Sequence, residues 1–408
     1  MQKVIPAQLK LSALQNEAAQ TALKRLETVG LPTKKSEAYR YFEIESLLNK
    51  EYDFIVPEKQ PVVEGERLEI VDGNVLSVPK GIEVHYSKER PILKDHFDPL
   101  YYLGHLLSKE VITITCENNA DFEIHHRFTK PDAFTPYRIV CNVEKNVQVR
   151  MSESFSGCDA KGSFILYGID LSLERDAQVE LIKDETLTQN IYTPIASHAF
   201  TLADQSTLNL YSFDFGHGSG LELLQIVLGA HTTLEAKHLL FAQESAKRGI
   251  VSQIVHAKES ARSNQSAKNI LQDKARGIFD ALIKIEKSGG GAKAYQNSKA
   301  VLLNDGAYMA SKPQLEIYID DVEASHGSTI GELDEDQLFY LRSRGISLTE
   351  ARKILILAFA NEIIDSIDDE KVRESVHRSF EEIYYGHAQL ECISTCHTCS
   401  DTILGDEA

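Results

Sequence analysis

At 408 residues, the chain exceeds the roughly 250 to 300 residues at which a single hydrophobic core stops growing, so several structural units are expected. Its 61 acidic and 43 basic residues give a formal net charge of -18, which would repel a phosphate backbone and argues against nucleic acid as a partner. Six cysteines are too few for a disulfide framework and indicate reduced thiols. Residues 1–15 lack a signal-peptide pattern, and no run of about 18 apolar residues occurs, so we expect a cytoplasmic protein outside the membrane.

A helix is predicted near the N-terminus, within residues 7–29. Apolar residues recur there at steps of three and four, and Gly30 and Pro32 follow as stop signals. We therefore assign residues 1–60 to an N-terminal helical region. The weak periodicity that follows predicts that residues 61–137 are a connecting segment with the first strands.

Strands dominate from about residue 138, where apolar and polar residues alternate with a period of two. A turn followed by a strand recurs in this stretch, with turns at 144–147, 174–177, 203–206, 229–232, 258–261 and 287–290. Successive turns end 30, 29, 26, 29 and 29 residues apart, the fixed period expected of a solenoid. We predict a parallel β-helix over residues 138–331. An antiparallel sandwich, whose turns also recur regularly, is the alternative.

Residues 332–390 are predicted to form a helical domain. The acidic residues 334–336 favour a helix start, and Gly345 marks its end. A third helix carries apolar residues at positions 372, 376, 380 and 383. We expect these helices to close one end of the solenoid, because an open coil end exposes unpaired strand edges.

The second helix of this domain has the clearest start signal. Ser347 and Glu350 form a capping box in front of the apolar run at residues 354–360. Such a run predicts a helix that is covered on several sides.

Residues 391–408 form a tail with three closely spaced cysteines, Cys392, Cys396 and Cys399. Thiolates at this spacing can bind iron, zinc or an iron-sulfur cluster. The spacing also resembles that of the radical S-adenosylmethionine enzymes, but those build a barrel after the motif, and too few residues follow it here. The alternative to a labile metal site is a thiol-bearing tail without a stable metal.

His326 is the candidate site residue of the last predicted strand. Counting the alternation back places it on the same face as Ala324 and Val322, opposite Ser325 and Glu323. The imidazole is then either a hydrogen-bonded residue of the interior or a ligand held at a subunit contact. The residues alone favour the first interpretation.

No other motif indicates a catalytic centre. The remaining histidines show no ligand spacing, and Cys116, Cys141 and Cys158 are expected to pack as small apolar side chains. The three glycines at 289–291 precede no Lys-Ser/Thr pair, which predicts a solenoid turn and not a phosphate-binding loop. An ATPase would have to be a separate chain.

Residues 312–331, Lys-Pro-Gln-Leu-Glu-Ile-Tyr-Ile-Asp-Asp-Val-Glu-Ala-Ser-His-Gly-Ser-Thr-Ile-Gly, closely resemble the SufB/SufD family. The likeness continues through residues 338–346, Leu-Phe-Tyr-Leu-Arg-Ser-Arg-Gly-Ile. It extends upstream to Ala-Tyr-Gln-Asn at 294–297 and, more weakly, to Gly-Leu-Pro-Thr-Lys-Lys-Ser-Glu-Ala-Tyr-Arg-Tyr at 30–41. The resemblance thus covers most of the chain.

This resemblance implies a right-handed parallel β-helix between helical regions, acting as a non-catalytic scaffold for iron-sulfur cluster assembly. It further implies a heterodimer with a SufB-type subunit and docking of a SufC-type ABC ATPase on the C-terminal helices. The cluster would be transient and shared with the partner, with no cofactor stably bound. The helix residues implied in ATPase docking are Leu338, Phe339, Tyr340, Arg342 and Arg344.

Three positions place the chain on the SufD side of the family. SufB-type chains carry an essential cysteine where this sequence has Asn297, and a Glu-His-Glu where it has Ser-His-Gly. In SufD-type proteins the histidine of that motif is tied to cluster assembly, which implies this role for His326. Many SufD sequences also have a cysteine two residues earlier, where this chain has Ala324.

Two other functions fit a β-helix. A homodimeric structural protein would use its exposed coil edges for self-association, and a homodimer is also expected of the isolated chain. A carbohydrate-active β-helix enzyme would display acidic and basic groups in a long cleft, and we expect such an enzyme to be secreted.

Overall fold

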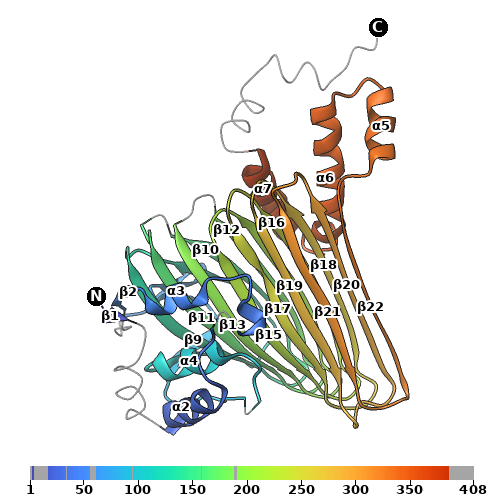
Figure 1. Cartoon of the computed structure of the whole chain (residues 1–408). Coiled ribbons are helices and arrows are strands. Elements are labelled where there is room, and N and C mark those ends of the chain that lie inside the picture. Colours follow the sequence, from blue (N-terminus) through green and yellow to red (C-terminus); the bar gives the residue numbers. More distant parts are fainter. Residues whose placement is uncertain are drawn as a thin grey trace.

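Two parallel β-sheets, built from alternate strands of one repeating coil, form the body of the protein (Figure 1). The computed structural model describes residues 2–3, 17–33, 35–55, 61–93, 95–157, 159–187 and 191–385. Strands that are next but one in the sequence pair side by side, as a β-solenoid requires. This arrangement confirms the predicted solenoid and excludes the antiparallel sandwich.

The coil has two main faces, here called sheet I and sheet II. Sheet I contains β9 (Ala133–Val143), β11 (Ser163–Leu173), β13 (Tyr192–Leu202), β15 (Gly220–Leu228), β17 (Lys247–His256), β19 (Arg276–Ile285) and β21 (Tyr308–Ile317). Sheet II contains β8 (Ala120–Arg127), β10 (Gln148–Ser156), β12 (Gln178–Leu187), β14 (Thr207–Gly216), β16 (Thr233–Ala242), β18 (Arg262–Leu271), β20 (Ala292–Leu302) and β22 (Val322–Gly331). Every neighbouring pair among these strands is parallel.

The recurring turns of the sequence form one edge of the stack. The third residue of each of the first five turns has a left-handed backbone, namely Asn146, Asp176, Gln205, His231 and Ser260. Their N–H groups donate to carbonyl oxygens of the next coil, as from Asn146 to Arg175 at 3.2 Å. In the sixth turn Gly291 has this conformation, with φ at 72°, so the predicted turn position lies two residues too early.

At the N-terminal end of the stack, antiparallel strands close the first coil. In sheet II, β4 (Leu68–Val71) pairs parallel with β8 and antiparallel with β5 (Asn74–Pro79). Strand β3 (Val63–Gly65) then pairs with β5. In sheet I, β6 (Glu83–Ser87) pairs antiparallel with β7 (Val111–Cys116), which pairs with β9. Much of the predicted connecting segment therefore consists of paired strands.

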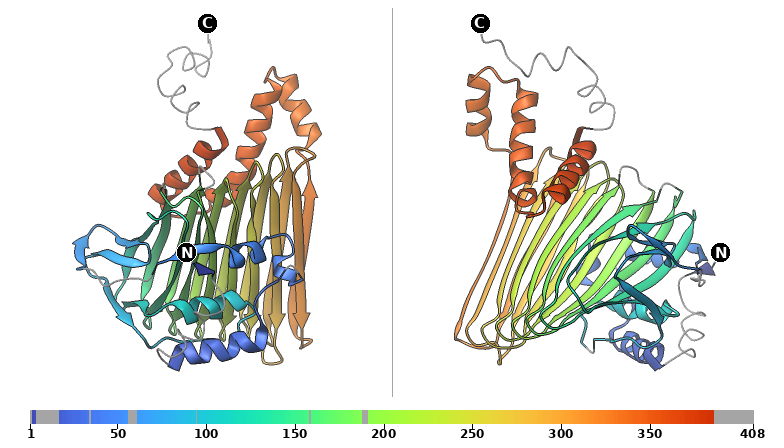
Figure 2. Two further views of the ribbon diagram at one scale, coloured as in Figure 1. Left: turned by 60° about the vertical axis from the view of Figure 1, so that its left-hand side comes forward. Right: turned by 180° about the vertical axis from the view of Figure 1, so that it is seen from behind.

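The N-terminal region lies along the outer face of sheet I (Figure 2). Its elements are β1 (Gln2–Lys3), α2 (Glu17–Val29), the 3-10 turn η1 (Glu37–Tyr39), α3 (Ile44–Asn49) and β2 (Glu51–Phe54). A further helix, α4 (Pro99–Leu107), which was not predicted from the sequence, packs between α2 and sheet I. Buried aromatic and aliphatic residues of these elements form a core with outward side chains of sheet I, among them Phe134 and Phe164.

Residues 35–55, here called the N-terminal strap, cross sheet I from its first coils to its last. Near the first coils, Lys50 donates from Nζ to the carbonyl oxygen of Gly162 at 2.7 Å. Further along, Lys247 forms an ion pair with Glu43 at 2.6 Å. The rings of Tyr41 and Tyr308 lie 5.7 Å apart, so the strap reaches β21.

Three helices follow the last strand: α5 (Glu335–Ser343), α6 (Leu348–Ile364) and α7 (Glu370–Tyr385). Their predicted order and capping are confirmed, since Ser347 accepts from the Glu350 N–H at 3.2 Å. The expectation that they close the end of the solenoid is wrong. Instead, α6 and α7 lie across the outer flank of sheet II over β12 to β18, because outward aromatic residues there, such as Phe215 and Phe241, offer an apolar surface (Figure 2).

Among the described residues, no helix has both the length and the apolar character needed to span a bilayer.

Candidate functional site

The last coil of the solenoid is open. Sheet I ends at β21 and sheet II ends at β22, and within the described residues neither strand has a partner on its outer side. Ile317 and Ile330, near the carboxyl ends of these strands, are 43% and 45% exposed, whereas Leu68 and Ile70 in the first coil are fully buried. The open end therefore combines free backbone edges with exposed apolar side chains, which is how a strand-pairing surface is built.

His326 lies in the middle of β22, on the face that points into the coil. Val322 and Ala324 pack against the solenoid core, which confirms that the three residues share the inward face. The imidazole Nδ1 lies 3.1 Å from the carbonyl oxygen of Pro313 on β21. His326 is nevertheless exposed, because no coil covers it, and β22 continues beyond it to Gly331.

The positions at which the sequence resembles SufD-type rather than SufB-type chains lie close to His326. Asn297 on β20 is exposed, points outward and pairs in register with Gly327. Ala324 packs its methyl group against the core. A second polar contact joins the last two strands, as Ser328 donates to Ser311 at 2.8 Å. Hydroxyl groups, a carbonyl and an imidazole, but no thiol, thus line the inner face of the last coil in the described residues.

A ladder of buried polar side chains lies directly below His326. Gln296, its register partner on β20, donates from Nε2 to Oε1 of Gln265 at 2.9 Å. Gln265 in turn donates from its own Nε2 to Ser252 at 2.9 Å and lies 3.3 Å from Nε2 of His238. This ladder was not predicted from the sequence, because its members are separated by at least 13 residues and meet only through the strand register.

Deeper in the coil, ion pairs fill the interior. Lys183 lies 3.2 Å from Glu185 and 3.5 Å from Glu222, and Arg248 contacts Glu185 at 2.6 Å and also Asp214. Burial alone would lower the pKa of Lys183, but the surrounding carboxylates outweigh it and raise this pKa. Burial raises the pKa of Asp214 to about 6 despite its contact with Arg248. These groups are enclosed and paired, so they hold the interior together and offer no open site.

The residues expected to dock an ATPase lie on α5 or, for Arg344, directly after it. Helix α5 projects from the body of the protein together with the start of α6 (Figure 1). Phe339 and Tyr340 are 75% and 57% exposed, and the guanidinium of Arg344 lies 5.3 Å from the Tyr340 ring centre. Arg342 is exposed and Leu338 is half-buried. This pair of helix segments, residues 335–356, is called the helical hairpin below.

The start of α6 is less covered than its apolar sequence predicts. Leu348 is 40% exposed and Ile354 is 42% exposed, whereas Ile356 and Ala360 are buried against sheet II. The expectation of a helix covered on several sides is therefore wrong for its first turns. Of the thirteen large apolar side chains exposed in the described residues, nine lie between Tyr295 and Ile354 and so belong to the open end or the hairpin.

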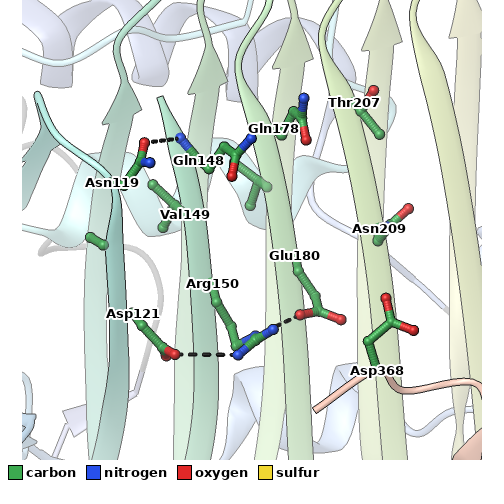
Figure 3. A pocket seen from close by; sticks show the side chains of 12 residues that line it. Asn119, Asp121, Gln148, Val149, Arg150, Gln178, Glu180, Thr207, Asn209 and Asp368 are labelled. Atoms are coloured by element: carbon green, nitrogen blue, oxygen red, sulfur yellow. Dashed lines mark hydrogen bonds and ion pairs between the residues drawn. The ribbon is translucent and has the colours of Figure 1, made fainter. Parts of the chain in front are cut away.

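A polar groove of about 580 Å³ lies on the outer face of sheet II, between β8 and β14 (Figure 3). Arg150 at its centre is paired with Asp121 at 3.3 Å, Glu180 at 2.7 Å and Asp369 at 2.8 Å. Of the three carboxylates that line the groove, those of Asp121 and Glu180 share one guanidinium, and that of Asp368 lies at its edge. Amide and hydroxyl groups line much of the remainder. This groove is where a carbohydrate-active β-helix enzyme would need an acid and a base, and its central carboxylates are already engaged.

The candidate metal ligands Cys392, Cys396 and Cys399 lie outside the described residues. In the part of the chain that the structure describes, no group of three or more His, Cys, Asp or Glu residues could hold a metal ion. Cys116 and Cys141 are buried free thiols on the neighbouring strands β7 and β9.

The family of the chain follows from two sequence models. The model described as the SufBD core domain of SUF system FeS cluster assembly matches residues 126–359, more than half of the chain. The chain belongs to the SufB/SufD family. A second model, for the SufBD protein N-terminal region, matches residues 7–75 and so includes the strap. The matched core domain spans sheets I and II, the helical hairpin and His326.

Several relatives of this SufB/SufD family chain are named as iron-sulfur cluster assembly proteins. The iron-sulfur cluster assembly protein SufD of Escherichia coli is 27% identical over 390 residues, covering 88% of this chain and 90% of that protein. A SufBD family iron-sulfur cluster assembly protein of Synechocystis is 25% identical over 85% of this chain and 86% of its own. SufD of Plasmodium falciparum is 27% identical over 72% of this chain, which spans 20% of that longer relative.

Proposed function

We propose that this chain is a non-catalytic SufD-type scaffold subunit that pairs through its open coil end with a SufB-type subunit and docks a SufC-type ATPase on its helical hairpin. Membership of a cluster-assembly family supports the general role. The observation that carries the pairing is the open end itself, where β21 and β22 combine free edges with exposed Ile317 and Ile330. The nascent cluster is a cargo of the complex and not a resident cofactor of this chain.

In this proposal, His326 contributes to the cluster site from the last coil. A carbonyl oxygen can only accept a hydrogen bond, so the contact with Pro313 O requires a proton on Nδ1 of the neutral ring. Nε2 then keeps its lone pair, the form in which histidine binds iron. The thiolates and carboxylates of the site come from the partner, since the described residues around His326 offer none. The reduced thiols expected from the sequence suit a cytoplasmic setting.

Co-purification from cells that express this chain with SufB-type and SufC-type partners tests the two surfaces separately. The double variant Ile317→Glu/Ile330→Glu should lose the SufB-type chain and retain the ATPase, because it places charge only on the open end. The double variant Phe339→Glu/Tyr340→Glu should lose the ATPase and retain the SufB-type chain. Val63→Glu is the matched control, since Val63 is also exposed, at 58%, but lies at the closed end of the solenoid.

His326→Ala tests the cluster site itself. The complex should form as in the wild type, while cluster formation, followed by visible absorption and iron content, should fall at least tenfold. Unchanged cluster formation in an intact complex would remove His326 from the site. Exclusive homodimers in the presence of both partners, measured by light scattering, would instead favour the structural homodimer.

A further inference from the structure

Two arginines and two tyrosines meet on the outer face of sheet I at the last coil. Arg40 and Tyr41 belong to the N-terminal strap, which reaches the last strands of the sheet (Figure 2). Arg276 begins β19 and Tyr308 begins β21. Tyr308 points outward, because its neighbour Met309 belongs to the solenoid core. The four side chains are all exposed, and together they are called the arginine–tyrosine patch.

Ring and cation contacts hold the patch together. The ring centres of Tyr41 and Tyr308 lie 5.7 Å apart. The guanidinium of Arg276 lies 5.1 Å from the centre of the Tyr308 ring, and that of Arg40 lies 5.7 Å from the centre of the Tyr41 ring. Contact with Tyr41 raises the pKa of Tyr308, and the charges of both arginines oppose this rise. Two positive charges are therefore brought to the last strand, although neither arginine belongs to it.

The two guanidiniums of the patch have no ion-pair partner among the described residues. Two other cations near the open end differ in this respect. Lys284 lies 5.7 Å from the ring centre of Tyr318, directly after β21, but it pairs with Glu286 at 2.6 Å. On sheet II, Lys293 pairs with Glu323 of β22 at 2.8 Å. Because the planar donor fork of arginine fits a carboxylate, the patch is open to acidic groups of another chain.

The free edge of β21 indicates which chain can reach the patch. A strand that pairs with this edge would lie about 4.8 Å away and would place an outward side chain of its own beside Tyr308. A carboxylate at that position would lie near the guanidinium that covers the Tyr308 ring. The net charge of -18 repels acidic surfaces from the chain as a whole, so a local pair of uncompensated positive charges favours this one approach.

We propose that the arginine–tyrosine patch is a second contact surface for the SufB-type partner, where it binds aspartate or glutamate side chains of the segment that lies against the start of β21. This inference rests on the proposed pairing at the open end and extends that interface to the N-terminal strap. Tyrosine and arginine are the residue types that often carry the binding energy of protein interfaces. Charged contacts at the rim of an interface act mainly on the rate of association.

Surface plasmon resonance between the full-length chain and the purified SufB-type partner, at several ionic strengths, tests the proposal. Arg40→Glu/Arg276→Glu should slow association about tenfold at low ionic strength, and the difference should shrink as salt is added. Lys80→Glu/Lys145→Glu is the matched control, because it changes the net charge equally at two exposed residues near the first coils. The control should associate within about twofold of the wild type. Equal association rates for the two double variants overturn the inference.

Ile317→Glu/Ile330→Glu, measured in the same assay, separates this inference from the proposed function. If that variant binds the SufB-type chain as the wild type does, the proposed pairing at the open end fails. If it loses the partner while Arg40→Glu/Arg276→Glu matches its control, the inference alone fails.

A second experiment keeps both arginines, because reversing their charge also weakens the contacts of the strap. Tyr41 is replaced by the photo-crosslinking residue p-benzoylphenylalanine, which retains an aromatic ring. Irradiation of the complex should join this position to the SufB-type chain, whereas the same label at Val63, at the closed end, should give no such product. A product with the ATPase or with a second copy of this chain, or no product at all, overturns the inference.

Discussion

The two ends of the solenoid are built from the same kind of coil but finished in opposite ways. At the N-terminal end, antiparallel strands pair with the first coil, and Ile70 is fully buried. At the C-terminal end, no described residue pairs with the outer edges of β21 and β22, and the helices that could have covered them lie on the flank of sheet II. The open end is therefore not a necessary consequence of the fold, because antiparallel strands of the same chain close the other end of the stack.

The largest expected effect is a difference in the loss of stability between two substitutions, one in the polar interior of the middle coils and one on the polar inner face of the last coil. Arg248→Met should lower the free energy of unfolding by about 3–5 kcal/mol, because it leaves the half-buried Asp214 without its cation and the buried Glu185 with Lys183 alone. His326→Ala should cost less than about 1 kcal/mol, since its single hydrogen bond lies in an exposed position. Urea unfolding at pH 7 measures both. Equal losses would show that the last coil is as closed as the middle.

Apolar residues at the two ends give the next contrast. Ile70→Ala should cost about 2–5 kcal/mol, the range for truncating a fully buried isoleucine. Ile330→Ala should stay within about 0.5 kcal/mol in the isolated chain, as for other surface substitutions. Thermal and urea unfolding report the two losses. If Ile330→Ala proved as damaging as Ile70→Ala, β22 would be covered in solution, by a second copy or otherwise.

The stability of the protein should also depend on pH, because the enclosed coils contain buried histidines. Burial lowers the pKa of His198, His238 and His256 to about 4 in the native state. In the unfolded chain they titrate near about 6.5, so between these values the unfolded state binds more protons, and stability falls as the pH falls. Each such group contributes a slope of about 1.4 kcal/mol per pH unit.

Asp214 acts in the opposite direction, because its native pKa is raised to about 6 and acid stabilises it relative to the unfolded chain. The measurement is therefore a difference between variants. From pH 6 to 5, His256→Gln should lose less stability than the wild type by about one histidine slope. Parallel curves for the two proteins would show that His256 is hydrated in solution.

The smallest expected effect concerns the helical hairpin, which is anchored less than the helices on the flank. Ser347→Ala removes the cap on the Glu350 N–H and should destabilise the start of α6 by about 1 kcal/mol. Amide exchange should accelerate roughly fivefold in α5 and the first turns of α6, and stay unchanged in β12 to β18. Acceleration throughout the sheets would mean that the hairpin unfolds only with the whole protein.

The positions of five of the six turns were predicted correctly from the sequence. Each turn contains a residue with a left-handed backbone whose N–H group bonds to the next coil. The position of His326 on the inward face followed from alternation alone, without knowledge of its neighbours. Helix α4 was missed although it carries a recognisable start, with Asp98 capping the Leu100 N–H and Pro99 in the first turn.

What the sequence could not supply is the pairing of distant residues. Gln265 and Gln296 look like ordinary strand residues until the register places one on the other. The helices were expected to cover the end of the stack. Their sequences contain apolar faces, but these do not indicate which surface of the solenoid the helices pack against. In β14 the apolar residues change from one face of the strand to the other, with Leu208 and Leu210 facing the core and Phe213 and Phe215 facing the helices. This change of phase was the available signal that both faces of the strand are covered.

The N-terminal strap has a consequence for the order in which the protein is made. Tyr41 leaves the ribosome 267 residues before Tyr308, and Glu43 leaves it 204 residues before Lys247. The coils are synthesised one after another, so the contact of the strap with Tyr308 can form only when β21 has been synthesised. Contacts so distant in sequence slow folding. Docking of the Tyr41 end of the strap is therefore a late folding event, which can only follow the synthesis of every strand of sheet I.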